Sequence, residues 1–146
     1  MTAPATAPTR TPADDAGRRR VYSALTGLAA LAVLLQGLWA GIFLEHDGQR
    51  DDAGGWIDVH ARGGEVALLL AVLAAVWALA RLRGRRDLVL GAIALTVLLV
   101  LEAYLGGLIR DDGKDSLTAI HVPLAMLLMG LTVWLPFRAA RKPAPC

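Results

Sequence analysis

Four long apolar runs constrain what this chain can fold into more than any other feature of its sequence. They cover residues 21–44, 56–80, 88–109 and 117–137, and the first of them contains no charged residue. About 20 predominantly apolar residues allow a helix to cross a bilayer, and a backbone without access to water must form its hydrogen bonds within that helix. We therefore predict an all-α fold, an integral membrane four-helix bundle.

Composition also indicates lipid as the solvent. Of the 146 residues, 55% are hydrophobic and 19% are charged, and the mean hydropathy is +0.50. A soluble domain of this size has too little interior to bury so much apolar surface. The single cysteine, Cys146, excludes an intrachain disulfide and any cysteine-rich metal site. The net charge is only +2, without a compact basic stripe, so we expect no nucleic-acid partner.

The distribution of charge predicts an orientation in the membrane. The N-terminal tail, the turn at 81–87 and the C-terminal tail hold eleven basic residues and three acids, a sum of +8. The opposite side holds four basic residues and ten acids, a sum of −6. Because basic loops stay on the cytoplasmic side, we expect both termini there. The absence of Asn and the excess of Arg over Lys (13 to 2) are typical of a GC-rich bacterial genome, which makes a bacterial inner membrane the expected location.

The two ends of the chain are expected to lie outside the bundle. Residues 1–20 are rich in Ala, Pro and Thr and have no apolar periodicity, so we predict a disordered cytoplasmic tail. Residues 138–146 form a short basic tail with two prolines. The bundle itself is expected to span 21–137.

An internal repeat relates the two halves of the membrane part. LQGLWAGIFLEHDG at 35–48 resembles LEAYLGGLIRDDG at 101–113, and this alignment places Gln36 opposite Glu102. IDVHARG at 57–63 then aligns with TAIHVPL at 118–124, so that His60 falls on His121. Both halves would run in the same sense, which predicts two helix pairs related as parallel repeats.

His60 and His121 are candidate metal ligands. Each lies about one turn inside the same boundary of its span, on helices that run in the same direction. Two such imidazoles that face inward across a bundle can bind the iron of one haem through its two axial positions. Two other interpretations remain open: interfacial histidines bonded to loop backbone, or a path for protons or ions.

Small residues follow His60 along one helical face, at Gly64, Ala67, Ala71, Ala74 and Ala78. They either allow close helix packing or leave room for a macrocycle. Pro123, two residues after His121, removes one helical hydrogen bond and either bends the start of that helix or marks a loose beginning.

Glu102 is the deepest acid in the sequence. A charge at that depth costs about 2.5–3.5 kcal/mol on insertion scales, so we expect Glu102 to face the bundle and to have a partner. Arg62, Arg110 and the second ring nitrogen of a histidine are the candidates for a charged Glu102. The alternative is a protonated acid bonded to Gln36 across the repeat.

Arg62 and Arg110 lie where haem propionates would leave such a bundle. Arginine suits carboxylates because its fork can bond both oxygens. Each arginine can instead be an ordinary flanking residue paired with a nearby acid such as Asp58, Glu65 or Asp111.

These residues together resemble the haem A synthase family. The resemblance is carried by LQGLWAG, by IDVHARG with His60, and by LGGLIRDDG followed by LTAIHVPLAML with His121. It covers residues 21–137, and it implies one four-helix half of such a protein, with a haem b held by His60 and His121. It also implies roles for Arg62, Arg110 and Glu102 around that haem.

The sequence departs from the family at positions tied to its activity. The first outer loop lacks the cysteine pair that the family often has, and Ile57 stands where the family places a functional glutamate. Haem binding is therefore better supported than synthase activity, and no catalytic residue is assigned. We predict a small membrane protein for electron transfer or haem handling; the alternatives are a cofactor-free accessory or scaffold subunit and a divergent haem-modifying enzyme. Besides the lipid bilayer, the expected partners are a second copy or a respiratory-chain protein.

Overall fold

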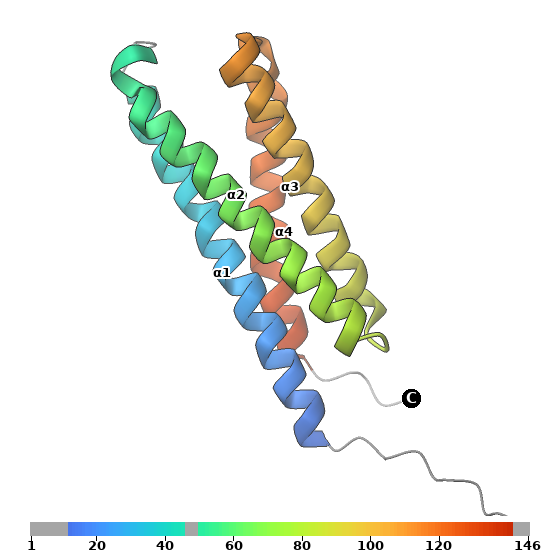
Figure 1. Cartoon of the computed structure of the whole chain (residues 1–146). Coiled ribbons are helices and arrows are strands. Elements are labelled where there is room, and N and C mark those ends of the chain that lie inside the picture. The colour runs from blue at the N-terminus through green and yellow to red at the C-terminus, as the bar shows by residue number, and fades with distance from the viewer. Residues whose placement is uncertain (1–11, 46–49, 142–146) are drawn as a thin grey trace, which may run out of the picture.

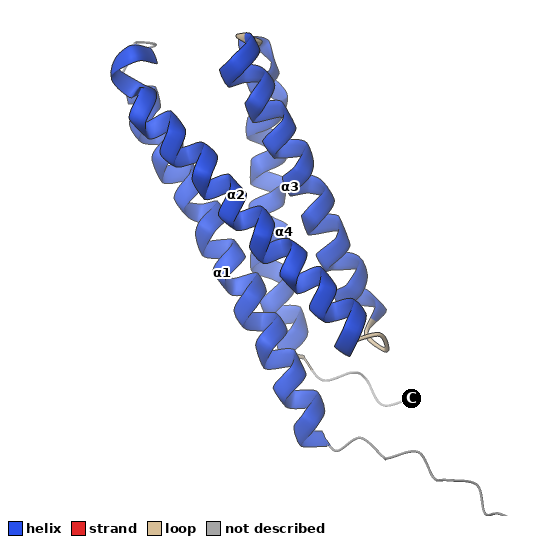
Figure 2. Cartoon of the chain, viewed as in Figure 1, coloured by secondary structure: helices blue, strands red, loops and turns tan. Residues whose placement is uncertain are grey.

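The computed structural model describes residues 12–45 and 50–141. In this part of the chain the fold is all-helical, with four long helices and one short 3₁₀ turn (Figures 1 and 2). The elements are α1 (Pro12–Glu45), α2 (Arg50–Arg81), α3 (Arg86–Asp112), η1 (Asp115–Leu117) and α4 (Thr118–Ala140). All four long helices are long and apolar enough to span a membrane. The structure therefore confirms the predicted all-α fold with four helices that could span a membrane.

The helices extend beyond the predicted apolar spans. α1 begins at Pro12, whereas the sequence predicted a disordered tail up to residue 20. Proline suits the first turn of a helix, and Asp14 and Asp15 in that turn interact favourably with the helix dipole. The indole nitrogen of Trp77 also donates to the carbonyl of Arg18 at 3.0 Å, which holds this first part of α1 against α2. The predicted tail segments at 1–11 and 142–146, and the loop at 46–49, lie outside the described residues.

The four helices pack in a ring. α1 contacts α2 and α4, and α3 contacts the same two helices, so α2 and α4 occupy opposite corners of the bundle. Figure 1 shows that the α1–α2 pair and the α3–α4 pair diverge toward the end where α1 and α3 finish. We call this the acidic end, because the predicted acidic loops follow α1 and α3 there. The opposite end, with the turn between α2 and α3, is the basic end.

Small residues form much of the core on the α2 side. Ala67, Ala71, Ala74 and Ala78 have no accessible surface, at the helical spacing that the sequence indicated. Large apolar side chains lie instead on the outside of the helices, where for example Leu69 is 58% exposed. Extended apolar surfaces of this kind are rare on soluble monomers and are the expected surface of a protein solvated by lipid.

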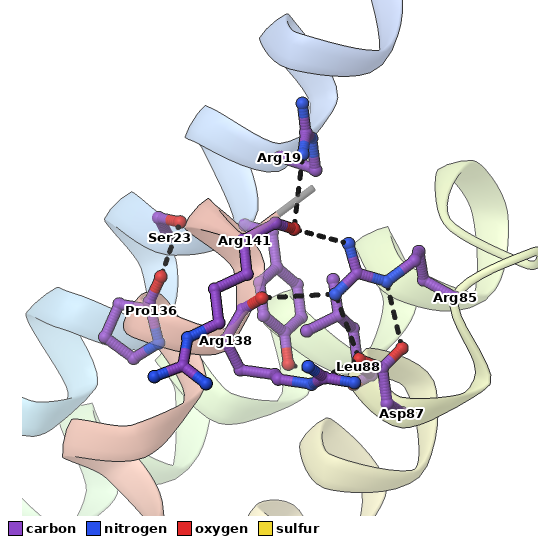
Figure 3. A network of polar contacts seen from close by, with 9 residues as sticks. Arg19, Ser23, Arg85, Asp87, Leu88, Pro136, Arg138 and Arg141 are labelled. Atoms are coloured by element: carbon purple, nitrogen blue, oxygen red, sulfur yellow. Dashed lines mark hydrogen bonds and ion pairs between the residues drawn. The ribbon is translucent and has the colours of Figure 1, made fainter. Parts of the chain in front are cut away.

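The basic end is closed by a polar clamp, formed by Arg85, Asp87 and Arg138 (Figure 3). The Arg85 guanidinium bonds both oxygens of the Asp87 carboxylate, at 3.0 and 2.9 Å. Arg138 from α4 reaches the same carboxylate at 2.7 Å. Arg85 also donates to the carbonyls of Arg138 and Arg141, at 3.1 and 3.2 Å, and so satisfies groups left unpaired at the end of α4. The clamp ties the start of α3 to the end of α4.

The clamp should contribute measurably to stability. Replacing Arg85 by alanine leaves the Asp87 carboxylate with Arg138 alone and removes two caps from α4. We expect the free energy of unfolding in detergent to fall by about 1–3 kcal/mol. Arg83→Ala is the matched control, because Arg83 is exposed and donates only to the carbonyl of Leu79, four residues before it. Equal unfolding curves for the two variants would contradict a stabilising clamp.

Candidate functional site

The two histidines predicted as ligands meet inside the acidic end of the bundle. His60 comes from α2 and His121 from α4, the helices at opposite corners. Their ring centres are 6.4 Å apart, and the ring planes are inclined by 66°. The sequence placed both histidines at the same depth, and the structure brings them together across the bundle axis.

The ring of His60 is oriented by α1. Its Nδ1 lies 3.1 Å from the backbone carbonyl oxygen of Gln36. A carbonyl can only accept, so Nδ1 carries the proton and donates it, and Nε2 keeps its lone pair. The ring of Phe43 packs against His60 edge-on, with the centres 5.5 Å apart. The acceptor belongs to a helix, which differs from the interpretation in which the histidines bond to loop backbone.

The ring of His121 is oriented by α3. Its Nδ1 is paired with Oε2 of Glu102. Glu102 is the deepest acid in the sequence, and its side chain is only 7% exposed, compared with 19% for that of His121. The structure therefore pairs Glu102 with a histidine, and not with Gln36, Arg62 or Arg110. The contact is an ion-pair contact between Nδ1 and the carboxyl group, and it leaves the Nε2 side of the His121 ring free of this carboxyl group.

Neither carboxyl oxygen of Glu102 has a hydrogen-bond partner among the described residues, although both are buried. A buried carboxylate in an apolar bundle is costly unless its charge is compensated. The arginines do not provide that compensation, because each is paired with an acid outside the bundle. Among the described residues, His121 is the one that the Glu102 carboxyl group contacts inside the bundle.

The two orienting contacts occupy corresponding places in the two helix pairs. Gln36 of α1 holds the histidine of α2, and Glu102 of α3 holds the histidine of α4. These are the positions that the sequence alignment places opposite each other. The correspondence has one chemical difference, because the acceptor is a neutral carbonyl in one pair and a carboxylate in the other.

The side chains of Arg62 on α2 and Arg110 on α3 lie outside the bundle. Arg62 is 3.7 Å from Glu65, and Arg110 is 2.7 Å from Asp111, with exposed side chains in both pairs. Exposed pairs of this kind contribute little to stability. The two arginines nevertheless line the same cleft, of about 500 Å³, together with Asp58, Ala61, Glu65 and Asp111.

The ligand set suits a planar macrocycle better than a bare ion. The described residues contain no group of three or more His, Cys, Asp or Glu side chains placed to hold a metal ion. A structural zinc site needs about four protein ligands, whereas a haem iron receives four bonds from the macrocycle and needs only axial ones. An imidazole nitrogen ligates a metal at about 2.0–2.1 Å, so two imidazoles on opposite sides of one ion have ring centres about 6 Å apart. The separation of His60 and His121 fits that requirement.

Close packing of α1 on α2 supports the His60 side of the site. A Cβ atom at Gly63 would collide with the side chains of Trp39 and Gln36, so a larger residue there requires these side chains to move. Gln36, Trp39 and Phe43 follow helical spacing, and that periodicity could have assigned them to one face with His60 as their neighbour. The backbone carbonyl of Gln36 leaves no signal in the sequence, because every residue has a carbonyl.

No protein-family model, curated protein or solved structure matches the chain. The described residues form a four-helix protein whose helices are long and apolar enough to span a membrane, with a histidine pair near one end. The resemblance to the haem A synthase family stays a prediction from the residues that carry it.

Gly63 and Gly64 provide a test of the close packing of α1 on α2. Gly63→Ala places a methyl group against Trp39 and Gln36 and should destabilise the fold by about 1–3 kcal/mol. Gly64→Ala is the control, because its Cβ would meet only Gln36, at 4.0 Å, and alanine favours helix. Thermal unfolding in detergent measures both. A Gly63→Ala variant as stable as Gly64→Ala would contradict the close approach.

Proposed function

We propose that the chain is an integral membrane protein that binds one haem b between His60 and His121, for electron transfer or haem handling. When bound, haem b supplies an iron that exchanges single electrons between its ferric and ferrous states. The alternatives remain a cofactor-free scaffold subunit and a haem-modifying enzyme.

The proposal rests on the contacts that orient the imidazole rings of His60 and His121. Both Nδ1 atoms contact oxygen atoms of neighbouring helices, the Gln36 carbonyl at His60 and the Glu102 carboxyl at His121, so Nε2 is the nitrogen left for a ligand in each ring. Ligating histidines commonly have this arrangement, since an acceptor on the second nitrogen sets the tautomer and the ring orientation. The ring separation of 6.4 Å then suits two ligands on one iron.

Other residues around the histidine pair would each have a role in holding the haem. The Gln36 carbonyl and the Glu102 carboxylate orient the ligands, and the buried Ala67 and Ala71 keep large side chains out of the bundle below the histidines. Arg62 and Arg110 line the cleft at the acidic end and would bond the two propionates there. Their exposed partners, Glu65 and Asp111, compete only weakly for them.

Low-spin absorption bands provide the direct test. Protein purified in detergent from haem-replete cells should give sharp α and Soret bands in a reduced-minus-oxidised spectrum, with about one haem per chain. His60→Ala and His121→Ala should each remove the low-spin signature, because each leaves the iron with one axial imidazole.

The outcomes separate the three functions. Low-spin bands that persist in both variants would exclude these ligands. A colourless, helical and monodisperse preparation would favour the scaffold subunit. A hydroxylated or formylated haem, found by mass spectrometry of the extracted cofactor, would favour the modifying enzyme.

We also propose that the basic end faces the cytoplasm of a bacterial cell and that the acidic end lies outside the inner membrane. The support is the charge difference between the two sides, +8 against −6, and the preference of basic residues for the cytoplasmic side. Both termini then lie in the cytoplasm, and the histidine pair lies near the outer surface.

The single cysteine makes this orientation testable without further engineering. A membrane-impermeant maleimide should leave Cys146 unmodified in intact spheroplasts and should label it after permeabilisation. The converse variant combines Cys146→Ser with Lys114→Cys, which moves the thiol to the turn between α3 and α4. That variant should be labelled in intact spheroplasts, and the opposite pattern would reverse the orientation.

A further inference from the structure

We propose that a cluster of arginines at the basic end of the bundle binds the headgroup phosphate of an anionic phospholipid. We call it the arginine cluster, and its members are Arg19 of α1, Arg85 in the turn before α3, Arg138 near the end of α4 and Arg141 just after that end. The cluster lies at the opposite end of the bundle from the histidine pair, so this inference does not depend on the proposed haem.

Figure 3 shows the arginine cluster around the end of α4. Arg19 and Arg85 both donate to the backbone carbonyl of Arg141, at 3.4 and 3.2 Å. Two cations held near one atom repel each other, and a carbonyl oxygen carries no net charge that would balance them. An anion beside these arginines therefore lowers the energy of the arrangement.

The chain supplies few anions of its own at the basic end. Three acids on this side accompany eleven basic residues, and two of those acids belong to the first turn of α1. The third, Asp87, is already shared by Arg85 and Arg138 in the clamp. Among the described residues, Arg19 and Arg141 form no ion pair with an acid. The cluster thus keeps positive charge that an external anion can neutralise.

The chemistry of these side chains favours a phosphate as that anion. The basic residues described at this end are all arginines. A guanidinium fork can bond two oxygens of one phosphate, and it is less strongly hydrated than a lysine ammonium group. Arg19 uses Nε and Nη1 for backbone carbonyls, which leaves Nη2 for a further acceptor. Basic groups of this kind between membrane helices bind the headgroups of anionic lipids.

An apolar face of α4 favours a phospholipid over a free phosphate ion. Trp134 and Phe137 are 47% and 67% exposed, and Arg141 follows them at helical spacing. The span of α4 that is apolar enough to cross a membrane ends at Ala140, so Arg141 stands where headgroups would begin. A phospholipid can place its acyl chains along Trp134 and Phe137 and its phosphate at Arg141, whereas a free ion gains nothing from the apolar face.

The experiment measures how much phosphatidylglycerol the purified chain retains in detergent. The chain is mixed with phosphatidylglycerol or with phosphatidylcholine, and native mass spectrometry counts the lipid molecules on each protein molecule. Phosphatidylglycerol should be retained at least about fivefold better, because the choline cation of the other lipid neutralises its phosphate and is repelled by the arginines.

Arg141→Gln tests the arginine cluster directly. It should weaken the retention of phosphatidylglycerol about fivefold, the usual effect of one basic residue beside an anionic lipid. The backbone carbonyl of Arg141 still accepts from Arg19 and Arg85 in this variant, so the fold should persist. Arg83→Gln is the matched control, because it removes the same charge from the same end at an exposed residue that donates only to the carbonyl of Leu79. It should retain phosphatidylglycerol as well as the wild type does. Circular dichroism and size-exclusion chromatography establish that both variants are folded.

Three outcomes would overturn the inference. Equal retention of the two lipids by the wild type would show that the anionic headgroup is not recognised. Equal losses in Arg141→Gln and Arg83→Gln would indicate diffuse attraction by the basic end instead of a site. Inorganic phosphate that displaces the lipid and raises the melting temperature of the wild type as much as phosphatidylglycerol does would assign the cluster to a free phosphate. None of these results bears on haem binding, which the absorption spectrum tests separately.

Discussion

The constraint on which the rest of the structure depends is the length and apolar character of the four helices, which suit a surrounding without water. It requires every backbone group there to bond within a helix, and it removes the usual penalty for large apolar side chains on the outside. Without a hydrophobic force between helices, small residues hold them together by close contact. The buried alanines of α2 and the approach of Trp39 to Gly63 are consequences of that constraint.

The two ends of the bundle differ in their polar contacts. At the basic end, Arg85, Asp87 and Arg138 pair with one another and satisfy the last carbonyls of α4. At the acidic end the helix pairs diverge (Figure 1). The buried Glu102 and the two histidines are the polar side chains that meet inside this end.

Polar groups inside an apolar helix bundle are costly, and two of those in the described residues contact the histidines. Glu102 contacts His121, and the Gln36 carbonyl accepts from His60. Elsewhere in the described residues, buried hydroxyl groups bond backbone carbonyls: Thr26 bonds that of Tyr22 in its own helix at 2.9 Å, and Tyr22 bonds that of Leu88 in α3 at 2.9 Å. Glu102 differs because its buried polar group is a carboxyl group.

The sequence by itself determined the four apolar helices, the depth of the two histidines and the position of Glu102 as the deepest acid, because these depend only on the order of residues along each helix. It misjudged the start of α1, where Pro12 and two acids continue the helix into a segment without apolar periodicity. Tertiary structure alone decided that His60 and His121 face each other, that Glu102 pairs with His121, and that a carbonyl of α1 orients His60. The physical reason is that contacts between helices depend on their tilt and rotation, which no pattern within a single helix encodes.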